Sequence, residues 1–237
     1  MHAGRVRPQV WLSAYVQLGI MADQARRRIV SPRRPSDTAD AKPFDWYSRG
    51  YLPHFDGGQL AQTITFRLFD SMPQSILDQW RVELAHLTQK DAEAARRKRI
   101  EAYIDRGCGH AWLKIPEIAD LIQQAILFFV GQRYRLGAWV VMPNHVHVLV
   151  TPNEGWELGR ILHSWKSFTS KECNKLLGRH GEFWQTESFD RYVRDEQHYH
   201  NAITYIENNP VNAGRCERPE DWPSSSARPG GARVSRA

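Results

Sequence analysis

The chain has 237 residues, 41% of them hydrophobic, which is enough for one ordinary domain with additional segments. Its formal net charge is +6, but residues 1–42 hold eight Lys/Arg against three Asp/Glu. The remainder holds 24 against 23, a net charge of +1, so overall charge does not identify a nucleic-acid-binding protein. No apolar stretch approaches the ~20 residues that span a bilayer. The three cysteines are scattered and odd in number, as in a reducing compartment, and we expect a cytoplasmic protein.

The pattern of apolar residues predicts an α+β protein, with strands mixed among helices. We predict strands at about 60–68, 111–114, 133–142 and 145–151, and helices at 74–87, 89–105, 116–130, 157–178 and 195–208. No internal repeat is evident. Three parts are expected: a basic, flexible arm over residues 1–45, a folded domain over 46–226, and a disordered tail over 227–237.

The strand predicted at 145–151 carries two histidines one residue apart, His145 and His147. Alternate side chains of a strand point to the same face, so both imidazoles project from one side and could converge on a metal ion. Taken alone, however, the pair is better explained as two polar residues on a solvated strand face.

A second pair lies in the last predicted helix, where Tyr205 and Asn209 are four residues apart and therefore share a helix face. Pro210 is expected to mark the end of that helix. Alone, this pair is better explained as a core tyrosine and a capping asparagine. Together with the histidines, a combined metal and tyrosine site becomes the better explanation. Tyr192 and Tyr199 are weaker candidates, since neither has an amide four residues on.

Two segments carry a family resemblance: residues 142–147 (Met-Pro-Asn-His-Val-His) and 205–214 (Tyr-Ile-Glu-Asn-Asn-Pro-Val-Asn-Ala-Gly). They resemble the REP-associated tyrosine transposases, a branch of the IS200-like, single-tyrosine HUH endonucleases. The resemblance runs in order through residues 46–226. It includes residues 49–55, 63–67, 164–169, 183–185, 189–195 and 222–225. Each segment is ordinary alone, but the ordered set is specific.

The resemblance implies a ferredoxin-like HUH fold, with an antiparallel central sheet flanked by helices and the 145–151 strand central. It implies that His145, His147 and Asn209 hold Mg²⁺ or Mn²⁺, with Asn209 where the superfamily often has glutamine. Tyr205 would be the catalytic nucleophile, forming a 5′-phosphotyrosine while single-stranded DNA is cleaved and rejoined at short palindromic, REP-like hairpins. We expect a monomer associated with the bacterial nucleoid, without a nucleotide cofactor and without a membrane partner.

Basic residues along the predicted helix 157–178 and before the last helix are candidates for DNA binding. They are Arg160, Lys166, Lys171, Arg191 and Arg194. A basic helix edge that also carries aromatic residues could follow a phosphate backbone and stack bases. An amphipathic helix with solvated cations explains the three residues of the helix equally well. The run Arg96–Arg99 presents the same choice.

Two other functions remain open from the sequence. One is a domesticated protein that binds hairpin DNA and has little or no nuclease activity. The other is a metal-dependent hydrolase of small phosphate esters, in which the histidines would be used and Tyr205 would be dispensable.

Overall fold

The structure is a computed structural model. It describes residues 46–48, 53–55 and 59–229. By its internal contacts the chain divides into two units, residues 1–42 and 43–237, and every described residue belongs to the second. The predicted arm over 1–45 and most of the predicted tail over 227–237 therefore lie outside the described residues.

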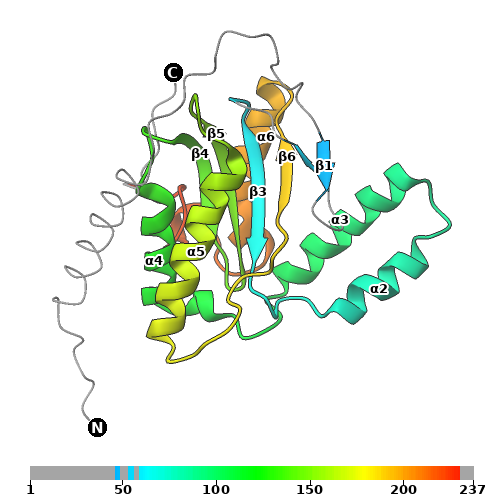
Figure 1. The fold of residues 1–237 in the computed structure, drawn as a ribbon, viewed down its shortest axis with the longest axis horizontal. Helices are drawn as coiled ribbons and strands as arrows, with labels where there is room; N and C mark the ends of the chain where they lie inside the picture. Colours follow the sequence, from blue (N-terminus) through cyan, green and yellow to red (C-terminus); the bar gives the residue numbers. More distant parts are fainter. Residues whose placement is uncertain (1–45, 49–52, 56–58, 230–237) are drawn as a thin grey trace. The chain divides into compact units, whose positions relative to one another are not determined.

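The described elements are strands and helices mixed along the chain (Figure 1). They are β1 (Trp46–Ser48), β2 (Pro53–Phe55), β3 (Gln62–Arg67), α2 (Gln74–Glu83), α3 (Gln89–Asp105), η1 (Trp112–Lys114), α4 (Pro116–Leu127), β4 (Tyr134–Val141), β5 (His145–Pro152), α5 (Leu158–Leu176), β6 (Phe189–Tyr192), α6 (Glu196–Asn212) and η2 (Pro219–Asp221). None of the helices in this part of the chain is long and apolar enough to cross a bilayer.

The main sheet has four antiparallel strands in the order β4-β5-β3-β6, and β1 pairs with β2 separately. With α2, α3 and η1 inserted between β3 and α4, the elements β3, α4, β4, β5, α5 and β6 follow the ferredoxin-like β-α-β-β-α-β arrangement. The predicted α+β fold, with an antiparallel sheet flanked by helices and β5 as an inner strand, is confirmed.

The two faces of the sheet bury different cores. Val146 and Val148 of β5 belong to the larger core, which α4 and α5 cover. Leu149 belongs to a smaller core on the opposite face, against α6. Because side chains alternate along a strand, His145 and His147 share the face of Leu149 and lie toward α6. The helix that carries the tyrosine therefore covers the face that carries both histidines (Figure 1).

Helix α6 lies close to the sheet at Gly137, where β4 has a β-bulge. The register of β4 against β5 shifts there, between Leu136 and Ala138. A Cβ atom on Gly137 would lie 2.5 Å from the Tyr199 hydroxyl and 2.7 Å from Leu149 Cδ2. Only glycine leaves room for the helix at this crossing.

Two sequence-based expectations about elements are wrong, and one strand was not predicted. Residues 111–114 contain the 3₁₀ turn η1 rather than a strand, with Ala111 in the left-handed region at φ 51°. Helix α6 continues through Pro210, which lies in its final turn and removes a single helical hydrogen bond; Gly214, at φ 64°, follows the helix. Strand β6 was not predicted, because Phe-Asp-Arg-Tyr is short and lacks clear alternation.

Candidate metal centre and tyrosine site

The two histidines of β5 are buried and held through their Nδ1 atoms. His145 and His147 are 0% and 3% exposed, and their ring centroids lie 4.7 Å apart. His147 Nδ1 is 2.7 Å from Thr65 Oγ1, and His145 Nδ1 is 2.8 Å from Asn144 Oδ1. The Asn144 amide is oriented by donation from its Nδ2 to the Cys108 carbonyl, at 2.9 Å. His145 Nδ1 therefore donates its proton to Asn144, which leaves a lone pair on His145 Nε2.

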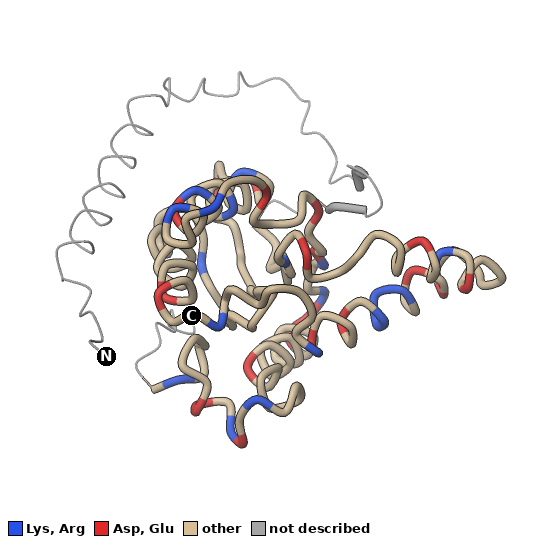
Figure 2. Tube along the Cα trace, turned by 90° about the horizontal axis from the view of Figure 1, so that it is seen from below, with Lys and Arg blue, Asp and Glu red and all other residues tan. Residues whose placement is uncertain are grey.

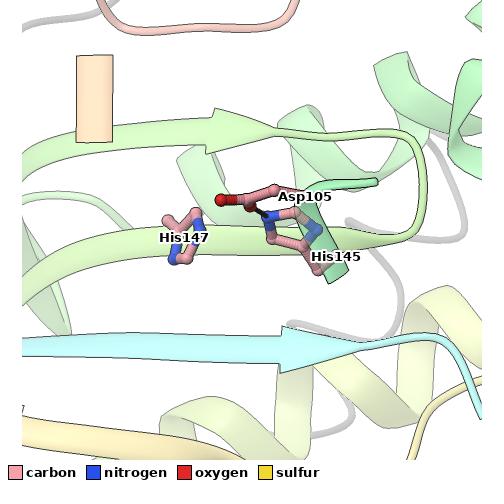
Figure 3. Close-up of side chains that lie close together, drawn as sticks. All are labelled: Asp105, His145 and His147. Carbon is pink, nitrogen blue, oxygen red and sulfur yellow. Dashed lines mark ion pairs between the residues drawn. The ribbon is translucent and has the colours of Figure 1, made fainter. Parts of the chain in front are cut away.

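A carboxylate completes this group from the end of α3. Asp105 Oδ1 lies 3.5 Å from His145 Nε2, and the potential ligand atoms of Asp105, His145 and His147 all lie within 4.8 Å of one another (Figure 3). These two atoms, His147 Nε2 and Asn209 Oδ1 have no hydrogen-bond partner in the described part of the chain. Buried polar atoms are seldom left unpartnered, and this mixture of imidazole, carboxylate and amide groups fits a divalent cation.

The protonation states also suit metal binding. Burial lowers the pKa of His147 to about 4, and burial together with the nearby His147 and Arg67 lowers the pKa of His145 well below its usual value. Both imidazoles are therefore neutral near pH 7. Burial raises the pKa of Asp105, which a hydrogen bond with Asn209 partly offsets. Nearby positive charge would favour the ionised carboxylate.

Tyr205 lies beside this group on α6. Its ring centroid is 5.6 Å from that of His147, and 39% of its surface is exposed, whereas Asn209 one turn later is buried. Burial and then the negative charges of Glu101 and Asp105 raise the pKa of Tyr205, while a hydrogen bond with Asn209 lowers it. The phenol is therefore protonated at neutral pH, and its use as a nucleophile requires a proton acceptor.

A cavity of about 290 Å³ opens next to the phenol, between β3, β6, α3 and α6. Its wall includes His147, Tyr205, Glu101, Arg97 and Arg191. A phosphodiester in this cavity would meet cationic groups beside the tyrosine. Of the five residues predicted to bind DNA, Arg191 is the one that lines this cavity. Its role in DNA binding remains a prediction.

The three predicted DNA-binding residues of α5 lie on the helix that covers the other face of the sheet. Arg160 pairs with Glu157 at 3.2 Å, and Lys171 is exposed. Lys166 donates to the Thr186 carbonyl at 2.9 Å and also to that of Gln185. The ammonium of Lys166 thus holds the segment before β6. None of the three is brought to the tyrosine, and their contact with DNA stays a prediction.

Arg194, the last of the five, lies just before α6. It is exposed, and its guanidinium carbon is 5.6 Å from the centroid of the Tyr192 ring. An exposed cation next to an aromatic ring is compatible with DNA contact, but it equally describes a surface cation–π pair. Its role also remains a prediction.

Comparison with known proteins finds the family over the segment that holds most of the site. Residues 117–209 match the family model described as Transposase IS200 like. Over these residues the chain is similar to the IS200-like transposases. The matched segment of this chain contains both histidines, Tyr205 and Asn209, whereas Asp105 precedes it. Asp105 and Glu101 are also the site residues that the sequence did not suggest, because only the fold brings the end of α3 to β5.

Among curated proteins, a REP-associated tyrosine transposase of Escherichia coli strain K12 is 29% identical over 108 residues. That match covers 45% of this chain and 63% of the relative, so the chain spans less than two thirds of the relative's length. A solved REP-associated tyrosine transposase bound to a REP hairpin aligns with a TM-score of 0.48 and 18% identity, over 75% of this chain and 82% of that one. A crystal structure of a Deinococcus radiodurans R1 protein described as a transposase aligns with a TM-score of 0.34 and 15% identity. The alignment covers 69% of this chain and 96% of that one.

Proposed function

We propose that this protein is a DNA strand transferase that cleaves and rejoins single-stranded DNA at short hairpins, with Tyr205 as its nucleophile. One observation carries the proposal: the Tyr205 ring lies beside His147, at the mouth of a buried group of unpartnered ligand atoms. We take REP-like hairpins as the substrate because the Escherichia coli relative is named for its association with REP.

In the proposed reaction, Tyr205 Oη attacks the phosphorus of a phosphodiester in the adjoining cavity. The bond from phosphorus to the 3′-oxygen breaks, and that oxygen leaves with a proton as a 3′-hydroxyl. The 5′-phosphate remains esterified to the tyrosine. Attack by a 3′-hydroxyl on this ester reverses the step and joins strands, so the ester conserves the bond energy and no nucleotide cofactor is required.

We assign the proton acceptor to Glu101. Its carboxylate lines the cavity together with Tyr205, and burial raises its pKa, which makes it a better acceptor near neutral pH. The cationic wall residues Arg97 and Arg191 would orient the phosphodiester and offset its charge.

His145, His147, Asp105 and Asn209 would hold Mg²⁺ or Mn²⁺. When bound, such an ion supplies Lewis-acid chemistry toward a phosphate oxygen. The residues of this chain contribute the rest. Asn144 fixes the tautomer of His145, and Asn209, one turn after Tyr205 on α6, has a buried Oδ1 without a partner among the described residues.

The test incubates the purified full chain with Mn²⁺ and labelled single-stranded hairpins from the repeats that flank its own gene. A denaturing protein gel compares wild type, Tyr205→Phe and the matched control Tyr199→Phe, which changes another tyrosine of α6. A labelled adduct is expected with wild type and the control only. His147→Ala should lose cleavage and keep hairpin binding.

Other outcomes support other functions. Hairpin binding by the wild type without an adduct or a cut strand would favour a domesticated binding protein. An adduct that persists in Tyr205→Phe would exclude Tyr205 as the nucleophile. Hydrolysis of a small phosphate ester that survives Tyr205→Phe would favour the hydrolase.

A further inference from the structure

A second cavity of about 290 Å³ lies beside the first, between the end of β3, the helices α2 and α3, and the segment before β6. Much of its wall is apolar, formed by Phe69, Leu77, Ile100 and Phe189. Phe189 also lines the cavity that contains Tyr205, so the two cavities adjoin at this ring. A ligand in the second cavity would be a direct neighbour of a phosphodiester in the first.

The second cavity contains a buried cation that is short of acceptors. Arg67 pairs in register with His145 across β3 and β5 and is 4% exposed. Its Nη2 donates to Gln185 Oε1 at 3.2 Å, whereas Nε and Nη1 have no hydrogen-bond partner among the described residues. Each of these nitrogens shares an edge of the guanidinium with Nη2, and the edge whose Nη2 hydrogen is not used by Gln185 can donate to two adjacent acceptors. A ligand with such a pair would offset the cost of burying the cation.

The shape and chemistry of this cavity select one kind of ligand. Its volume is at the small end for ligand pockets, which suits one planar base rather than a base pair. The wall carries Arg67, Arg81 and Arg96 as well as Glu182 and Glu187, and this mixed charge matches a neutral base that both donates and accepts hydrogen bonds. Guanine presents O6 and N7 as adjacent acceptors, matching Arg67, and its N1–H and amino groups are donors that carboxylates can accept. The ring of Phe189, 5.2 Å from the Arg67 guanidinium carbon, offers an aromatic contact.

We propose that this cavity binds an unpaired guanine of the DNA strand, adjacent to the phosphodiester that Tyr205 attacks. This inference rests on the proposed function and adds base selection to it. It also gives a role to α2 and α3, which precede the matched segment 117–209 and form the outer wall. Arg96 lines the cavity proposed for guanine and Arg97 lines the cavity beside Tyr205, so the basic run on α3 serves both. Figure 2 shows Lys and Arg gathered along this helix.

The test measures binding without metal, so that it does not depend on cleavage. Fluorescence anisotropy of the full chain in EDTA would compare labelled oligothymidylate with the same strand carrying one central guanine, adenine, inosine or 7-deazaguanine. Guanine should bind about tenfold tighter than thymine or adenine, as expected for a bidentate arginine contact. Loss of N7 in 7-deazaguanine and loss of the amino group in inosine should each remove much of that advantage.

Arg67→Lys should bind guanine and 7-deazaguanine equally, whereas the control Arg218→Lys, at an exposed arginine paired with Asp221, should keep the discrimination. The base analogues test the proposal on wild-type protein even if Arg67→Lys does not fold. Equal affinity for all strands, another base bound as tightly as guanine, or no binding of any strand would overturn it. A guanine preference without a tyrosine adduct would count against the proposed cleavage alone.

Discussion

Changing Asp105 to asparagine separates a metal ligand from an ordinary buried carboxylate. The substitution keeps the shape of the side chain and one oxygen, but it removes the charge 3.5 Å from His145 Nε2. Substitution of a residue that only supports a metal ligand typically lowers metal affinity by ~10–100-fold. Substitution of a ligand itself should lower the affinity at least as much. We therefore expect Mn²⁺ binding to weaken by ~1.4–2.8 kcal/mol or more.

The same change should not destabilise the metal-free protein, although it weakens metal binding. Burial raises the pKa of Asp105, which means that the fold disfavours its ionised form. Asparagine removes that desolvation cost, so the metal-free protein should unfold at the same or a higher temperature than wild type. A substitution that merely disrupted packing would lower both metal affinity and metal-free stability.

Isothermal titration with MnCl₂ near pH 7.5 and thermal unfolding in EDTA measure the two quantities. Glu101→Gln is the matched control, because Glu101 lies one turn earlier on α3 and lines the tyrosine cavity without belonging to the His/Asp group. It should leave Mn²⁺ affinity unchanged. Unaltered affinity in Asp105→Asn, whatever its effect on stability, would refute the assignment of Asp105 as a ligand.

Three further predictions follow from particular contacts. Burial lowers the pKa of His147 from 6.5 to about 4, so between these pH values the unfolded chain binds a proton that the folded chain does not. In EDTA, the free energy of unfolding should therefore fall by up to ~3 kcal/mol between pH 6.5 and 4. Urea titrations at several pH values measure this dependence, and His147→Gln should flatten it. Gly137→Ala should cost ~1–3 kcal/mol because its methyl group meets both the Tyr199 hydroxyl and Leu149 Cδ2, and an unchanged free energy of unfolding would contradict this crowding. Asn209→Ala should weaken Mn²⁺ binding by calorimetry less than His145→Ala does, and no change at all would remove Asn209 from the ligand set.

The sequence predicted the fold class well because its strongest signals are local. The helices α4 and α5 carry clear periodicity and strand β5 is a β-branched apolar run, and their predicted ranges agree with the structure to within a few residues at most boundaries. Short elements were missed where the signal depends on neighbours. Strand β6 exists because its backbone pairs with β3, from Gln62–Tyr192 to Thr65–Phe189, and its four residues show no period of their own.

The candidate site likewise contains residues that local spacing predicts and one that it does not. The spacing of His145 and His147 and that of Tyr205 and Asn209 each place two side chains on one face of one element, and the structure brings the two pairs together. Asp105 could not be found by spacing, since its approach to β5 depends on the path of the chain from α3 through η1 and α4. A carboxylate at a helix end has no local signature of metal binding.

The burial of this group argues for a bound ligand rather than a structural polar cluster. Strand β5 is covered on both faces, so its histidines occupy positions where apolar side chains would be stabilising. Leaving a buried polar group unpartnered costs about 1–3 kcal/mol, and the net stability of a domain is only ~5–15 kcal/mol. Hydrogen bonds with Thr65 and Asn144 satisfy the Nδ1 atoms alone. Two imidazole nitrogens, a carboxylate oxygen and an amide oxygen remain beside Tyr205, and one cation shared among them would offset all four costs at once.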